Sequence, residues 1–233
     1  MRKVLLVLLI ILIVGVIAAD RVGVAVAQDQ IAKQVAAQNN LPRKPDVKIH
    51  GIPFLTQAIG GEYKKIDVGI GQMTQQGVTL EDVQVELDNV KAPLSDVING
   101  DTSNVVAGTA TASAIVPYEA VERRAPSAVK SISANGSNLQ VKGSMTVLGF
   151  TGDVTIVAAV RATAKGIGVT PQSVRTGSGP AVPLALLQQR FTFTVPVKDL
   201  PLGSRISKVE VTSDGLRIAA TADNVRLNEV PRT

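Results

Sequence analysis

The feature that most constrains this chain is an unbroken apolar run at its N-terminus. Arg2 and Lys3 carry positive charge, and Val4 to Ala19 follow without a single polar side chain. A helix in the core of a soluble protein rarely lacks polar residues on every side, whereas a signal or anchor segment has this pattern. We therefore predict a hydrophobic signal or anchor segment over residues 1–19 and a single domain over residues 20–233.

The fate of this segment has two interpretations. Its sixteen apolar residues fall short of the ~20 that a bilayer-spanning helix needs, and Ala25-Val26-Ala27 offers the small residues that a signal peptidase requires before Gln28. In contrast, Val24, Gln28 and Ile31 recur at helical spacing, which favours a helix that continues past this site and retains the segment as an anchor. We favour the anchor. In either case the positive end stays in the cytoplasm, so the domain is expected outside the cytoplasmic membrane, in the periplasm or cell envelope.

Composition excludes several kinds of chemistry. The chain has no cysteine and one histidine, His50, so thiolate and histidine-rich metal sites are excluded. It also has no nucleophile-elbow motif and no phosphate-binding loop. With no Trp, two Tyr and four Phe, a sugar-cleaving site that stacks rings on aromatic side chains is disfavoured. We predict a non-enzyme with no catalytic residue, no metal and no cofactor, and a surface or structural role for His50.

The charge balance argues against nucleic acid as a partner. Residues 1–19 contain two basic and no acidic side chains, so 22 basic and 19 acidic residues remain, a net charge of +3. Nucleic-acid-binding domains generally have a stronger basic excess.

The periodicity changes once along the chain. Asp20 to Asn40 has the pattern of an amphipathic helix, and alternating residues after it predict antiparallel strands, with shorter helices at Pro117 to Arg124 and at Val182 to Arg190, the latter acting as a lid. The strands are predicted around residues 66–70, 83–87, 104–116, 139–141, 154–164, 209–211 and 216–222. Many strand residues are small, which permits a strongly curved sheet. The sequence thus predicts a strand-rich α+β fold in which a long N-terminal helix packs on an antiparallel sheet.

Two stretches resemble a known family. Ile49-His-Gly-Ile-Pro-Phe-Leu-Thr-Gln57, followed by Gly61-Glu-Tyr63, resembles the opening of the LmeA-type phospholipid-binding proteins of actinobacterial cell envelopes. Val197 to Ile206, with Val209 to Val211 and Asp214-Gly-Leu216 after it, resembles the closing hairpin of that family. The resemblance extends over nearly the whole chain.

The resemblance implies a tubular lipid-binding type of fold, in which the long helix is cradled by a curved sheet that encloses an apolar groove. It also implies non-catalytic binding of phospholipids, including phosphoinositides, with transfer or presentation in support of lipomannan-type lipoglycan biogenesis. Envelope glycan-assembly enzymes are then expected partners, besides the membrane that the N-terminal segment contacts. The alternative is a structural domain that holds a cell-wall enzyme in place without a lipid ligand. A long apolar cavity favours the first function and a filled core favours the second.

Candidate ligand contacts follow from apolar and basic side chains that lie close in sequence. For the lipid groove we predict Phe54, Leu55, Leu184, Leu186, Leu187, Phe191 and Phe193, each of which has ordinary core packing as its alternative. For an anionic headgroup we predict Lys64, Lys65, Arg123 and Arg124, with solvated surface charge as the alternative.

Overall fold

The computed structural model describes residues 2–75, 77–99, 101, 103–123, 125, 127, 129–147, 150–163, 166–176, 192–196 and 203–229. Within them the helices are α1 (Arg2–Gln38), α2 (Phe54–Gly60), α3 (Leu94–Asn99), α4 (Tyr118–Glu122) and the 3-10 helix η2 (Leu227–Glu229). The strands are β1 (Asp46–His50), β2 (Glu62–Gln75), β3 (Val78–Lys91), β4 (Val106–Pro117), β5 (Val129–Asn135), β6 (Asn138–Val147), β7 (Phe150–Thr163), β8 (Gly166–Thr176), β9 (Phe193–Pro196), β10 (Arg205–Val211) and β11 (Gly215–Arg226).

The strands form two antiparallel sheets. One has six strands in the order β1-β2-β3-β4-β11-β10, and the other has five in the order β5-β6-β7-β8-β9. The predicted strand-rich α+β fold with a long N-terminal helix is therefore confirmed. The predicted helix over Val182 to Arg190 lies outside the described residues.

The chain divides into two compact units, one of residues 1–70, 85–110 and 223–233 and the other of residues 71–84 and 111–222. We refer to them as the first and the second unit. Strands β2, β3, β4 and β11 each contribute residues to both units. The single domain over residues 20–233 stays a prediction.

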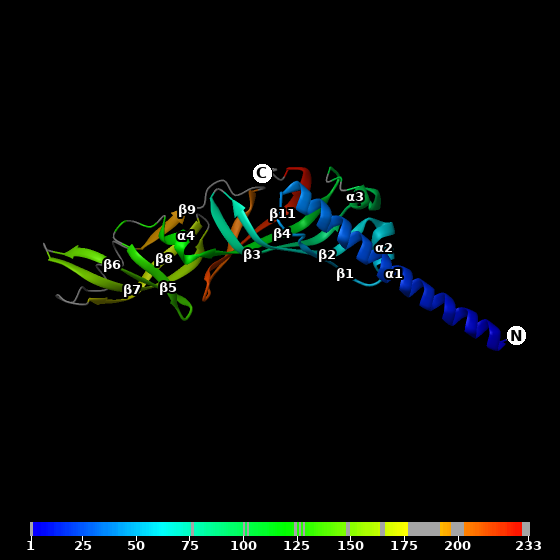
Figure 1. The fold of residues 1–233 in the computed structure, drawn as a ribbon, viewed down its shortest axis with the longest axis horizontal. Coiled ribbons are helices and arrows are strands. Elements are labelled where there is room, and N and C mark those ends of the chain that lie inside the picture. Colours follow the sequence, from blue (N-terminus) through cyan, green and yellow to red (C-terminus); the bar gives the residue numbers. More distant parts are fainter. Residues whose placement is uncertain are drawn as a thin grey trace. The chain divides into compact units, whose positions relative to one another are not determined.

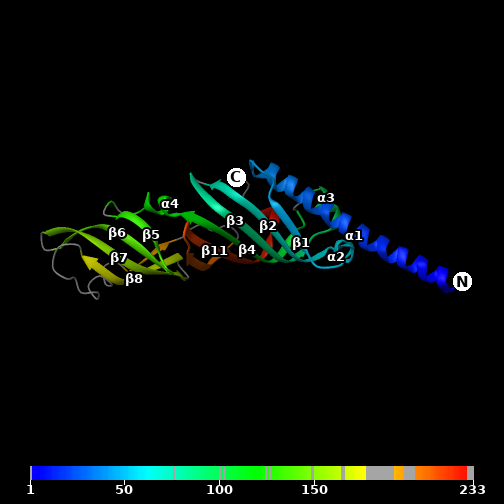
Figure 2. The same ribbon diagram turned by 60° about the horizontal axis from the view of Figure 1, so that its bottom comes forward.

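In the first unit, α1 is one continuous helix that includes both the apolar run and the amphipathic segment. It is long and apolar enough to cross a membrane, a criterion that an N-terminal signal sequence also meets. Its later part contacts β1, α2 and α3, and both ribbon views show its N-terminal part extending beyond these elements (Figures 1 and 2). Ala27 and Ala32 are its buried apolar residues, and Phe54, Tyr63 and Val90 are buried in the same unit.

The second unit contains the five-stranded sheet together with α4, β10 and parts of the longer strands. Its core is a cluster of Tyr118, Ile132, Leu139 and Leu216, to which half-buried valines of β5, β6, β7 and β10 add contacts. Strand β10 packs against β7 and β8, and α4 packs against β5. This packing covers part of one face of the five-stranded sheet.

Candidate functional site

The five-stranded sheet has one apolar and one polar face. Residues opposite each other in an antiparallel pair share a face, and neighbours along a strand alternate between faces. The register aligns Ile132, Val141, Ile156 and Val174 in one row across β5, β6, β7 and β8. The adjacent row, on the opposite face, is Ser131, Lys142, Thr155 and Arg175. A sheet with this pattern must cover its apolar face with protein or with a ligand.

The cover over the apolar face is partial. Leu139 and Ala158, which pair with each other, are 4% and 2% exposed. By contrast, Val141, Ile156 and Val174 are only half-buried, although they are apolar and lie side by side in register. We call these three residues the valine-isoleucine row. Among the described residues of the five-stranded sheet, the row is a continuous strip of incompletely buried aliphatic surface. It begins at Val141, which packs partly against the core cluster, and an acyl chain can cover the surface that remains open.

Helix α4 is hydrogen-bonded to the turn between β10 and β11 and to strand β5. The hydroxyl of Tyr118 donates a hydrogen bond of 2.7 Å to the carbonyl of Thr212, and the Glu122 carboxylate accepts one of 2.5 Å from the backbone N–H of Ile132. Burial raises the pKa of Tyr118, so this phenol stays a neutral donor over the physiological range. The helix therefore couples the β10–β11 turn to the first strand of the five-stranded sheet.

The predicted headgroup residues lie in different environments. Arg123 is exposed at the end of α4, the helix that packs against β5 in the second unit. Lys64 and Lys65 belong to β2 in the first unit, where successive side chains point to opposite faces. Arg124 lies outside the described residues.

Of the two lysines, Lys65 is already paired. Its Nζ lies 2.9 Å from Glu86 Oε2 and 3.5 Å from Asp67 Oδ1. The hydrogen bond to Glu86, with the charge of Asp67, raises the pKa of Lys65, which therefore carries its charge at neutral pH. Phosphate must compete with these carboxylates for Lys65, whereas Lys64 is exposed.

The predicted groove residues are only partly within the described chain. Phe54 is buried, and its ring centroid lies 6.3 Å from that of Tyr63. Leu55, next to it in α2, is half-buried. Phe193 pairs through its backbone with Val169 on β8. The remaining four, Leu184, Leu186, Leu187 and Phe191, lie outside the described residues. The groove assignment of these residues stays a prediction.

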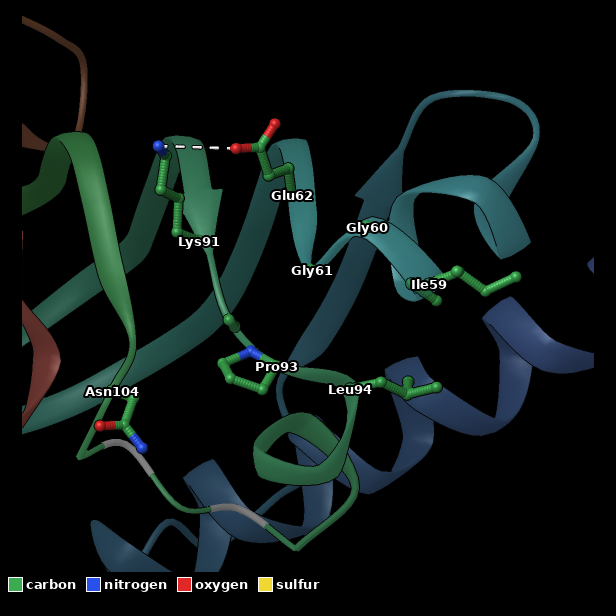
Figure 3. Close-up of a pocket in the computed structure, with 10 residues that line it drawn as sticks. Ile59, Gly60, Gly61, Glu62, Lys91, Pro93, Leu94 and Asn104 are labelled. Carbon is green, nitrogen blue, oxygen red and sulfur yellow. Dashed lines mark ion pairs between the residues drawn. The ribbon is translucent and has the colours of Figure 1, made fainter.

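The first unit contains a pocket of about 590 Å³, a volume within the range of ligand-binding pockets. Ala58 and Ile59 of α2, Ala92 and Pro93 after β3, and Leu94 of α3 provide its apolar lining (Figure 3). A Glu62–Lys91 ion pair of 3.5 Å stands at the pocket, with both side chains about 70% exposed. Such a pair is worth little, since water screens it. The pocket thus combines an aliphatic lining with charges that water or a headgroup can reach.

The single histidine, His50, is paired with a carboxylate on the neighbouring strand. Its Nε2 lies 2.7 Å from Asp67 Oδ2 in an exposed pair between neighbouring strands β1 and β2. Among the residues that the structure describes, no group of three or more His, Cys, Asp or Glu side chains could hold a metal ion.

Sequence reasoning missed the valine-isoleucine row. A signal was present, because Val154, Ile156, Ala158, Val160 and Ala162 occupy every second position of β7. The pattern was hard to recognise because Val157 and Ala159, which lie on the other face, are also apolar. The row itself joins residues from three strands, so only the strand register could reveal it.

Comparison with known proteins identifies a family for this chain. The family model described as LmeA-like phospholipid-binding matches residues 18–221, the bulk of the chain. Searches of curated proteins and of solved structures found no match. The match begins within the apolar part of α1 and extends through the five-stranded sheet into β11. The chain belongs to the LmeA-like phospholipid-binding family.

Proposed function

We propose that this protein binds phospholipids without catalysis and acts outside the cytoplasmic membrane, with α1 as its anchor. The acyl chains lie against the valine-isoleucine row of the five-stranded sheet. The protein transfers or presents its lipid in support of lipomannan-type lipoglycan biogenesis, next to envelope glycan-assembly enzymes. The family supports phospholipid as the ligand class, and the half-buried aliphatic strip carries the assignment of the site.

The physical argument for an acyl ligand is the chemistry of the strip. Val141, Ile156 and Val174 offer only aliphatic carbon, without a hydrogen-bonding group. Covering such surface stabilises a complex by roughly 25 cal/mol per Å², and this gain does not depend on the direction of the ligand. A flexible hydrocarbon chain therefore suits the strip, whereas a sugar or a nucleotide would lose hydrogen bonds to water there.

Native mass spectrometry of the full chain, purified in mild detergent, tests this function. We expect phospholipid to remain bound to the protein at collision energies that remove the detergent. The alternative function, a scaffold without a ligand, predicts bare protein under the same conditions, and lipid-free protein from a lipid-replete membrane preparation would favour it.

A preference for anionic headgroups, including phosphoinositides, is expected from Arg123. A guanidinium can bind phosphate through two hydrogen bonds, but an exposed pair contributes only ~0.2–1 kcal/mol. Replacing Arg123 by Ser should therefore reduce the preference for phosphatidylinositol phosphate over phosphatidylcholine by at most about fivefold at low salt.

The matched control for this variant is Lys142→Ser, which removes an exposed charge from the polar face of the five-stranded sheet in the same unit. Competition between the two lipids in vesicle-binding assays measures the effect. An unchanged preference in Arg123→Ser would remove Arg123 from the headgroup site.

The non-catalytic function predicts that His50 is dispensable. Its contact with Asp67 is exposed, so His50→Ala should leave both the amount of bound lipid and the thermal stability close to those of the original chain. Lipid extracts incubated with the protein should show no new product by thin-layer chromatography. A product formed by the original chain but not by His50→Ala would establish catalysis.

A further inference from the structure

Exposed aliphatic side chains gather in one region of the first unit. Beyond the apolar run of α1, the exposed large hydrophobic residues in the described part of the chain are Val22, Val26, Ile52, Ile59, Leu94 and Ile98. They belong to α1, α2 with its preceding loop, and α3, and α1 contacts both shorter helices. Ile52 and Ile59 are 81% and 85% exposed. Leaving two isoleucines so open to water is unfavourable unless something apolar covers them.

The position of α2 along α1 indicates what covers Ile52 and Ile59. The backbone N–H of Leu55 donates a hydrogen bond of 2.8 Å to Asp20 Oδ1. Three residues further along, a Cβ placed on Gly23 would lie 3.4 Å from the Phe54 ring and 3.6 Å from Leu55. The start of α2 is thus fixed against α1 at residues 20–23, immediately after the apolar run ends at Ala19.

The length of the apolar run makes this position significant. At ~1.5 Å per residue, Val4 to Ala19 extend for about 24 Å, whereas the hydrocarbon core of a bilayer is ~30 Å thick. A helix with such a shortfall needs extra apolar surface at its end or must thin the bilayer. Residues 20–23 lie within about 6 Å of the end of the run, which is the depth of the headgroup layer.

The carboxylate of Asp20 at this level is already satisfied within the protein. Asp20 is 4% exposed, although it follows the apolar run directly. Its carboxylate is paired with Arg21 and accepts the hydrogen bond from Leu55. A carboxylate near hydrocarbon is costly unless it is paired and hydrogen-bonded. The arrangement is therefore suited to contact with lipid.

We propose that α2 and the loop before it form an interfacial element, in which Ile52 and Ile59 insert into the same bilayer that the apolar run of α1 crosses and complete its short hydrophobic span. This inference goes beyond lipid binding and rests on the proposed anchoring by α1. Ile59 and Leu94 also line the 590 Å³ pocket, and their side chains extend in the same direction in Figure 3. In the proposed arrangement, these two lining residues of the pocket face the bilayer.

The chain contains no Trp. The fluorescence of a single introduced Trp therefore reports the depth of that residue in the bilayer without a signal from other Trp residues. We would reconstitute Ile59→Trp in phosphatidylcholine vesicles with and without dibrominated acyl chains and measure fluorescence quenching. Val14→Trp, within the apolar run, is the inserted reference. Ala37→Trp is the outer reference, since Ala37 is exposed on α1 and lies about 27 Å beyond Ala19 along the helix.

Insertion predicts that Ile59→Trp is clearly quenched, though less than the deeper Val14→Trp, with emission shifted to shorter wavelength, while Ala37→Trp is not quenched. Ile52→Trp should behave like Ile59→Trp. If Ile59→Trp behaves like Ala37→Trp while Val14→Trp is quenched, the anchor stands and the interfacial role of α2 is wrong. If Val14→Trp is also unquenched, anchoring and insertion both fail. The lipid that co-purifies with the same variants tests the proposed function separately.

Discussion

Replacing Ile156 by Asp should weaken lipid binding about a hundredfold while the protein stays folded. Ile156 is the central residue of the valine-isoleucine row and is half-buried, so a carboxylate there can reach water when no ligand is bound. With an acyl chain in place, the same carboxylate would face hydrocarbon. Placing Asp in hydrocarbon costs ~2.5–3.5 kcal/mol, which corresponds to an affinity loss of about two orders of magnitude.

The neighbouring residue provides the control for this prediction. Thr155 lies on the polar face between Lys142 and Arg175, so Thr155→Asp introduces the same charge on the same strand without touching the row. Native mass spectrometry measures bound lipid, and circular dichroism measures folding. If Ile156→Asp fails to fold, Val174→Ser tests the row with a smaller change. Normal lipid content in folded Ile156→Asp would exclude the row as the acyl site.

Replacing Gly215 by Ala should cause the largest loss of stability among small substitutions. A Cβ at this position would lie 2.2 Å from the carbonyl oxygen of Val116 and 2.9 Å from the Ile115 side chain. The clash is with backbone, which cannot turn aside as a flexible side chain does. Overpacking typically costs 1–3 kcal/mol, so we expect about 3 kcal/mol and a fall in Tm of roughly 6–12 °C.

The clash should also disturb neighbouring hydrogen bonds, because Gly215 closes a hydrogen-bonded turn. Its carbonyl accepts a 2.9 Å hydrogen bond from the backbone N–H of Thr212, and the carbonyl of Thr212 accepts the Tyr118 hydroxyl. Gly60→Ala is the control, since nothing lies within 4 Å of its added Cβ. Thermal unfolding of both variants in detergent measures the two Tm values. A Tm of Gly215→Ala within a degree of that of Gly60→Ala would contradict the close approach of Gly215 to Val116.

The sequence predicted most elements whose pattern is local. The apolar run and the helical spacing of Val24, Gln28 and Ile31 predicted the continuous helix α1. Pro117 predicted the start of α4, which is observed over Tyr118–Glu122. The predicted strand over residues 154–164 corresponds to most of β7. In each case neighbouring residues in the chain determine the structure, so period and helix-start signals suffice.

Helix α2 was missed for a physical reason. Its seven residues, Phe54–Gly60, are too few to show a helical period, and its apolar composition fits a groove as well as a helix. A signal did exist. Gly61 ends the helix in the left-handed conformation, with a φ of 66°, which glycine adopts readily. Its docking on Asp20 depends on a contact between residues 35 positions apart, which no local pattern encodes.

The candidate lipid surface depended on register in the same way. Each strand alone shows a modest alternation, and the strip becomes visible only when Val141, Ile156 and Val174 are paired. The predicted groove residue Phe54 proved to pack against Tyr63 in the first unit. Aromatic side chains are conspicuous in a sequence with so few of them, whereas valines on three strands are not.

The most direct test of the central claim is to map where a bound phospholipid touches the protein. We would load the full chain with a phosphatidylinositol that carries a photoreactive diazirine in one acyl chain, irradiate it, and identify the labelled peptides by mass spectrometry. The apolar run of α1 will be labelled wherever it contacts lipid, so the informative peptides are those of β6, β7 and β8. We predict labels on Val141, Ile156 or Val174 that disappear when unlabelled phospholipid is added in excess. Labels confined to α1, or found equally on the polar-face residues Thr155 and Ser173, would contradict an acyl-binding sheet face.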